Sequence, residues 1–139
     1  MSDNTIKSLL KAAIGARENA YSAYSKFRVG AALLCDDGKV FTGCNVENAV
    51  YGLTICAERV AMVKAISEGH RKFTAVAVSS DLAEVLASPC GPCRQFMIEF
   101  GDFDVYLVQP DGQRHQKTTV KELLPGAFTP HILKNEARC

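Results

Sequence analysis

Three of the six cysteines have the spacing expected of a metal site. Cys90 and Cys93 belong to a Cys-Gly-Pro-Cys segment, and Cys56 stands earlier in a Cys-Ala-Glu segment. Zn²⁺ prefers sulfur and nitrogen ligands in a tetrahedron, and catalytic zinc keeps one of its four positions open. We therefore expect Cys56, Cys90 and Cys93 to hold one zinc ion with an open fourth position.

An acidic side chain follows the first of these cysteines by two residues. In the first turn of a helix, the carboxylate of Glu58 can reach water at the metal without ligating the metal itself. A carboxylate in that position can accept a proton from water and deliver it to another atom. Glu58 is therefore the expected catalytic acid–base residue.

The charge of three thiolates needs compensation if the metal is to remain a good electrophile. We expect helices to begin near Cys56 and Cys90, and each helix N-terminus carries a partial positive charge. Arg59 lies on the same helical face as Cys56 and can donate hydrogen bonds to the thiolates. Arg59 is thus expected to support the metal ligands without touching the metal.

Two other interpretations of these cysteines stay open at this point. Cys90-Gly-Pro-Cys93 is also the active-site tetrapeptide of thioredoxin-like thiol–disulfide oxidoreductases. A structural zinc-binding module could instead take Cys44 or His70 as a fourth ligand. The position of the tetrapeptide past the middle of the chain and the absence of tryptophan oppose the redox interpretation. A structural zinc would need no Glu58.

The remaining cysteines and the histidines carry less information. Cys35 and Cys44 lie on or beside expected strands, where a small buried hydrophobic role is the default. Cys139 is a terminal thiol with no visible partner. Surface positions are expected for His70, His115 and His131.

Hydrophobic periodicity predicts alternating helices and strands around the candidate site. One helix is expected to begin near Ile6, a second after Thr54 as its N-cap, and a third with Pro92 in its first helical position. Thr119 with Glu122 forms a capping box for a short fourth helix. The expected strands cover residues 28–35, 39–43, 73–79, 105–108 and 113–118. This order predicts a mixed five-stranded sheet with helices on both faces, a three-layer α/β/α domain.

Length and composition limit the classes of function. The chain has 139 residues, 47% of them hydrophobic, which predicts one globular domain over residues 1–139. A net charge of +1 gives no electrostatic footprint for nucleic acid, and no apolar run approaches the ~18 residues of a membrane span. The polar first residues do not resemble a signal peptide, so we expect a cytoplasmic protein with reduced thiols.

With these residues assembled, the chain resembles the cytidine deaminase family, in its small form with one zinc ion per chain. The resemblance rests on residues 24–33, 43–51, 56–59, 88–95 and 122–125. It implies the cytidine-deaminase-like α/β/α fold and zinc as the cofactor. The implied reaction is hydrolytic deamination of cytidine and 2′-deoxycytidine to uridine and 2′-deoxyuridine with release of ammonia, a step of pyrimidine salvage.

The resemblance also implies roles for individual residues. Asn45 and Glu47 would hold the ribose hydroxyls, Phe27 would pack on the pyrimidine, and the backbone N–H of Ala57 would help to hold the base. Family members are homotetramers whose pockets are completed by neighbouring chains, and Tyr51 and Phe128 match positions at such contacts. The implied substrate-binding set is Phe27, Asn45, Val46, Glu47, Asn48, Ala49, Val50, Tyr51, Ala57 and Phe128.

Related deaminases with other substrates fit less well. Deoxycytidylate and polynucleotide-editing deaminases typically have histidine as the first metal ligand and need basic groups for phosphate, whereas this chain has Cys56 and a net charge of +1. A nucleoside-antibiotic deaminase also uses three cysteines, but residues 45–48 fit it less well. The expected partners are a nucleoside and further copies of the chain, rather than nucleic acid or a membrane.

Overall fold

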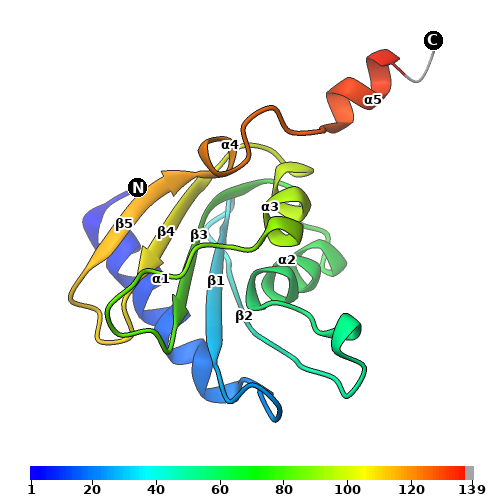
Figure 1. The fold of residues 1–139 in the computed structure, drawn as a ribbon. Helices are drawn as coiled ribbons and strands as arrows, with labels where there is room; N and C mark the ends of the chain where they lie inside the picture. Colours follow the sequence, from blue (N-terminus) through cyan, green and yellow to red (C-terminus); the bar gives the residue numbers. More distant parts are fainter. Residues whose placement is uncertain (137–139) are drawn as a thin grey trace.

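A mixed sheet forms the middle layer of residues 1–136, the part of the chain that the computed structural model describes (Figure 1). Its five strands are β1 (Val29–Cys35), β2 (Val40–Cys44), β3 (Phe73–Ser80), β4 (Asp104–Val108) and β5 (His115–Thr119). The strand order is β2-β1-β3-β4-β5, with β3 and β4 parallel and the other neighbours antiparallel. The predicted mixed sheet is confirmed.

Helices cover both faces of this sheet (Figure 1). One face carries α1 (Asp3–Ala16), and the other carries α2 (Ala57–Ser67) and α3 (Gly91–Ile98). The shorter elements are η1 (Arg17–Asn19), η2 (Tyr51–Leu53), α4 (Val120–Leu123) and α5 (Pro130–Glu136). Sequence analysis did not predict α5, which runs away from the sheet. No helix within residues 1–136 has the length and hydrophobicity to cross a bilayer.

The interior strand β1 is buried on both faces. Ala32 and Leu34 pack with Leu9 of α1, whereas Ala31 and Leu33 pack in the cluster that contains Met62 of α2. Successive side chains of a strand point to opposite faces, so a strand covered by two layers must be apolar throughout. This explains the unbroken apolar run of residues 29–35.

Cysteines occupy the N-cap positions of α2 and α3, the two helices on the same face of the sheet. Sequence analysis placed the N-cap of α2 at Thr54, but the N-cap is Cys56. Ile55 pairs with Val46 in a β-bridge, which keeps the chain extended up to that point. The N-cap of α3 is Cys90, and Pro92 occupies the second helical position rather than the first. Both N-cap thiols therefore lie in front of a helix N-terminus.

Gly43 sets the distance between β2 and α2. A Cβ atom at this position would lie 2.5 Å from the carbonyl oxygen of Ala57 and 2.5 Å from the backbone nitrogen of Ala61. Both neighbours are backbone atoms of a helix, which cannot rotate away as a flexible side chain can. Glycine is thus required here, because it lets the first turn of α2 approach the sheet.

Candidate active site

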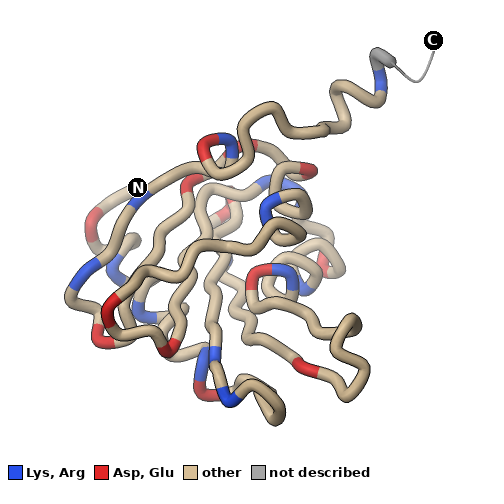
Figure 2. Tube along the Cα trace, in the orientation of Figure 1, with Lys and Arg blue, Asp and Glu red and all other residues tan. Residues whose placement is uncertain are grey.

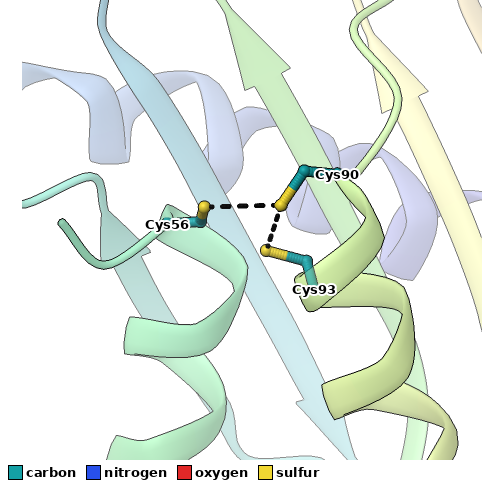
Figure 3. A group of neighbouring side chains, drawn as sticks. All are labelled: Cys56, Cys90 and Cys93. Carbon is teal, nitrogen blue, oxygen red and sulfur yellow. Dashed lines mark hydrogen bonds between the residues drawn. The ribbon is translucent and has the colours of Figure 1, made fainter. Parts of the chain in front are cut away.

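Three thiols converge between the N-termini of α2 and α3 (Figure 3). The Sγ of Cys90 lies 3.6 Å from the Sγ of Cys56 and 3.3 Å from the Sγ of Cys93. Around a tetrahedral zinc ion with Zn–S distances of about 2.3 Å, sulfur atoms stand about 3.8 Å apart. The donor set and its spacing therefore fit Zn²⁺ with little rearrangement.

The metal-competent group at this place contains these three cysteines without Cys44 or His70, within the described part of the chain. Cys93 is buried, Cys56 is half-buried and Cys90 is exposed. Three protein ligands with one exposed thiol leave a fourth position accessible from outside. This is the arrangement of a catalytic rather than a structural zinc site.

The surroundings of the thiols favour the thiolate at Cys56. A hydrogen bond from the thiol of Cys93, opposed by burial and aided by Arg59, lowers the pKa of Cys56 to about 5. The same contact with Cys56, together with burial, raises the pKa of Cys93. Arg59 lies where it was expected, with its Nη2 3.7 Å from the Sγ of Cys56 and 3.3 Å from the Thr54 carbonyl.

Glu58 is the buried carboxyl group of the site. Only 4% of its surface is exposed, and it lines the same cavity as Cys56 and Cys90. Burial is the main cause that raises the pKa of Glu58 to about 7. A carboxyl group that titrates near neutral pH can both accept and donate a proton. The position and environment of Glu58 therefore suit proton transfer.

One cavity lies beside the thiols and adjoins a second, outer pocket. The inner cavity, of roughly 220 Å³, is lined by four predicted residues besides the cysteines, namely Phe27, Asn45, Ala57 and Glu58. Sequence analysis missed five further wall residues, which are Val29, Thr54, Val78, Ala87 and Ser88. The outer pocket, of roughly 290 Å³, is lined by Tyr24, Ser25, Glu47, Asn48, Tyr51 and Thr54. Thr54 belongs to both linings and connects them.

Asn45 fixes the backbone that carries Phe27. Its Nδ2 donates to the Phe27 carbonyl at 2.8 Å, and its Oδ1 accepts from the Val29 N–H at 2.9 Å. Asn45 is 8% exposed, whereas Phe27 is half-buried in the cavity wall. One N–H and one lone pair of the amide remain available, because a primary amide has two of each.

Glu47 is anchored by the segment that precedes Phe27. Its Oε1 accepts from the backbone N–H groups of Tyr24 and Ser25 at 3.0 Å each, and its Oε2 accepts from the Ser25 hydroxyl. The bond from the Ser25 hydroxyl is the largest cause that lowers the pKa of Glu47. A carboxylate that stays ionised thus faces the outer pocket.

Only some of the other residues in the expected substrate-binding set line a pocket. Asn48 and Tyr51 line the outer pocket, whereas Val46, Ala49 and Val50 lie outside both linings and are exposed. Phe128 is 58% exposed and also lies outside both pockets, with its carbonyl accepting from Gln95 Nε2 at 2.9 Å. Within one protomer, these four side chains do not contribute to the cavity walls.

The cysteines outside the site follow the expectation in part. Cys35 is buried, as predicted, and Cys44 is half-buried. Cys139 lies outside the described residues. His115 is exposed, as expected, whereas His70 is half-buried rather than on the surface. Basic and acidic residues are interspersed along the chain trace in Figure 2.

Comparison with known proteins adds independent information. Residues 3–109 match the family model for the "cytidine and deoxycytidylate deaminase zinc-binding region". A probable cytidine deaminase of Dictyostelium discoideum is 50% identical over 133 residues, which cover 96% of this chain and 90% of the relative. The cytidine deaminase of Halalkalibacterium halodurans is 56% identical over 123 residues, or 87% of this chain and 92% of the relative.

Solved structures give the same result. The crystal structure of cytidine deaminase from Burkholderia pseudomallei superposes with a TM-score of 0.84 at 47% identity. The superposition covers 92% of this chain and all of that structure. The α/β/α fold is therefore shared with an experimentally determined cytidine deaminase over nearly the full length of this chain.

Proposed function

The chain belongs to the cytidine and deoxycytidylate deaminase family, and on this premise we propose that it converts cytidine and 2′-deoxycytidine to uridine and 2′-deoxyuridine by zinc-dependent hydrolysis, with release of ammonia. One observation carries the proposal at the level of the site. The buried carboxyl group of Glu58 and two of the three clustered thiols, those of Cys56 and Cys90, line one cavity.

Cys56, Cys90 and Cys93 would hold the zinc ion. Bound there, zinc would lower the pKa of water and so supply a nucleophile at neutral pH. Arg59 and the N-termini of α2 and α3 offset the negative charge of three thiolates. With this compensation, a bound zinc ion would remain electrophilic enough to activate water.

Glu58 moves the protons of the reaction. Its carboxylate takes a proton from the attacking water and passes it to N3 of the cytosine ring while the oxygen adds at C4. The second water proton then leaves with the 4-amino group, which departs as ammonia, and the ring keeps a carbonyl oxygen at C4. Burial raises the pKa of Glu58 above the ordinary glutamate value, which favours its use as both proton acceptor and proton donor.

Four residues hold the nucleoside in this proposal. The ring of Phe27 packs on the pyrimidine face, and the N–H of Ala57 donates to the base. Ala57 is the first residue of α2, so its N–H has no acceptor within the helix. Asn45 and Glu47 hold the ribose hydroxyls with the hydrogen-bonding capacity that their contacts to residues 24–29 leave free.

Glu47 also favours a nucleoside over a nucleotide. The family includes deoxycytidylate deaminases, whose substrate carries a phosphate. An ionised carboxylate in the outer pocket repels a phosphate and leaves a neutral ribose unaffected. The test is a comparison of cytidine and cytidine monophosphate at equal concentration, in which cytidine should react far faster.

The functional unit in this proposal is a homotetramer. Large apolar side chains stand exposed around the outer pocket and along the C-terminal segment, namely Val50, Tyr51, Leu53, Phe128 and Leu133. The segment that includes α5 runs away from the sheet, as an arm that packs on a second copy would do (Figure 1). Sedimentation or light scattering should give four chains per particle, and a fully active monomer would contradict this part of the proposal.

The redox alternative has its own test. If Cys90 and Cys93 served thiol–disulfide exchange, zinc-free reduced protein would reduce insulin, whereas the deaminase should not.

A metal site made of thiols alone suits the reducing cytoplasm. We therefore place the enzyme in that compartment, as part of pyrimidine salvage.

A further inference from the structure

Arg94 connects the loop between β3 and α3 to the short helix α4. Its Nε donates to the Pro89 carbonyl at 2.7 Å, and its Nη2 donates to the Ser88 hydroxyl at 2.8 Å. Its Nη1 donates to the Leu123 carbonyl at 2.7 Å. These lengths are typical of charge-assisted hydrogen bonds. Because all three nitrogens belong to one rigid planar group, the three acceptors are held in a fixed arrangement.

The loop of residues 82–89 has little other support. Within residues 1–136, none of its backbone groups takes part in a backbone–backbone hydrogen bond. Near β3, the Leu82 N–H donates to the Ser80 hydroxyl, and the Ala83 carbonyl accepts from Gln109. At the other end of the loop, next to Cys90, the hydrogen bonds come from Arg94.

Helix α4 is a firm support for this contact. Its first residue, Val120, is fully buried, and the Val120 N–H donates to the Phe103 carbonyl at 3.1 Å. Leu123 is the last residue of α4, and carbonyls in the last turn have no donor within their own helix. Arg94 supplies that donor. It thereby links residues 122–125, a segment on which the family resemblance rests, to the site.

The part of the loop that Arg94 holds is a wall of the inner cavity. Ala87, Ser88 and Cys90 line this cavity. Arg94 itself does not line it and, among the described residues, donates no hydrogen bond to a cysteine sulfur. Its position therefore differs from that of Arg59, whose Nη2 lies 3.7 Å from a thiol sulfur.

We propose that Arg94 is a positioning residue for deamination, an inference that rests on the proposed function. It holds residues 87–90 against α4, so that the base meets Glu58 and the thiol cluster in reactive geometry. A displacement of about 1 Å at a reacting centre can cost about 10²-fold in rate. The ribose is held on the other side by Asn45 and Glu47, so loss of Arg94 should lower kcat more than it weakens binding.

The test is Arg94→Lys, with kcat and KM for cytidine measured separately. Lysine keeps the positive charge but lacks the planar fork that serves three acceptors. We expect kcat to fall by about 10²-fold and KM to change by less than about threefold. Measured without substrate, in competition with a chelator, the affinity for Zn²⁺ should fall by about tenfold, because the wall includes Cys90.

Arg71→Lys is the matched control. Arg71 Nη1 donates to the carbonyls of Ile66 and His70 at 2.7 and 3.0 Å, at the end of α2 away from the thiols. This variant also removes an arginine that bonds backbone carbonyls, but it should leave kcat, KM and zinc affinity unchanged. Urea unfolding of both variants shows whether any loss of stability accompanies the kinetic effect.

Ser88→Ala is the second variant, and it removes one of the three acceptors at an exposed position. It should lower kcat in the same direction by a smaller factor. Wild-type kcat in Arg94→Lys, or a rise in KM alone, would overturn the proposal even if that variant is less stable. If Arg94→Lys does not fold, wild-type kcat in Ser88→Ala would overturn it. A wild type that does not consume cytidine would instead refute the proposed function.

Discussion

Asn45 donates a hydrogen bond from its Nδ2 to the backbone carbonyl of Phe27 at 2.8 Å. The same side chain accepts from the Val29 N–H, so one amide holds the chain on both sides of Arg28. A residue assigned to the substrate therefore also builds the wall on which the substrate rests. Removal of Asn45 should therefore weaken both substrate binding and the stability of the fold, and the two effects can be measured separately.

Asn45→Ala should raise the KM for cytidine and also lower the free energy of unfolding. The partly buried Val29 N–H would lose its acceptor, which costs about 1 kcal/mol. Urea unfolding and steady-state kinetics measure the two effects. Asn4→Ala on the exposed side of α1 is the control, and it should change neither quantity. Unchanged stability in Asn45→Ala would show that the hydrogen bonds to residues 27–29 do not hold the wall.

Gly43→Ala should destabilise the fold and impair the site together. The new Cβ would collide with the backbone of α2 at Ala57 and Ala61, so the helix must shift away from β2. Such overpacking costs about 1–3 kcal/mol, and here it displaces the residues next to Cys56 and Glu58. Urea unfolding and cytidine turnover are the measurements.

Gly15→Ala is the matched control for this variant, because its Cβ would meet nothing within 4 Å. Gly15 lies inside α1, where alanine is favoured over glycine by about 0.5–1 kcal/mol. The control should therefore be at least as stable as the wild type. Equal behaviour of the two variants would refute the close approach at Gly43.

The sequence already contains much of this organisation. The apolar periods of residues 6–14 and 28–35 follow from burial of one helix face and of both strand faces, so both elements were predictable. The cysteine spacing predicted the metal centre, because zinc chemistry restricts the ligand types. The start of α2 was misplaced because Thr54 is a good N-cap type, whereas the Val46–Ile55 bridge that decides the matter depends on tertiary structure.

Several residues of the pocket walls could not be predicted from the sequence pattern alone. Val78 and Ala87 carry no chemical signature, and they reach the cavity only because β3 and the loop after it pass beside α2. The Ser25 hydroxyl that holds Glu47 belongs to a segment more than twenty residues away. Ser25 and Ser88 both lie inside the segments that carry the family resemblance. The resemblance is therefore the signal that could have identified them from the sequence.

Asp81 should make stability depend on pH in the acid range. Its carboxylate accepts from the Arg28 guanidinium and backbone N–H and from Arg17 Nη1 at 2.8 Å, and the Arg28 side chain is the largest cause that lowers the pKa of Asp81. Folded Asp81 therefore binds a proton less readily than unfolded Asp81. Its contribution is fully present above about pH 4, the ordinary aspartate pKa, and disappears as the pH falls through the lower folded value.

The measurement is urea unfolding of the wild type and Asp81→Asn from neutral pH down to about pH 3. The wild type should be more stable at neutral pH, and the difference should shrink below about pH 4. Zinc loss in acid affects both proteins and cancels in the difference. Asp111→Asn in the exposed β4–β5 turn is the control. A difference that stays constant with pH would contradict the stated role of Asp81.

Cys93→Ala should abolish both zinc binding at the catalytic centre and deamination. Cys93 is the buried member of the thiol cluster, and two remaining thiols cannot hold zinc tightly enough against dialysis. Zinc analysis and cytidine turnover test this directly. Cys44→Ala, which removes a thiol outside the catalytic thiol cluster, should retain zinc and activity. Full turnover in zinc-depleted Cys93→Ala would contradict a metal-dependent reaction.

The central claim is that Glu58 transfers protons at a zinc site that it does not help to hold. The decisive measurement is the zinc content of Glu58→Gln together with its rate of cytidine consumption, followed by the loss of cytidine absorbance. The account predicts the same zinc content as the wild type and a rate lower by about 10²–10⁴-fold, because the amide cannot take up the proton. Wild-type turnover in Glu58→Gln would contradict it.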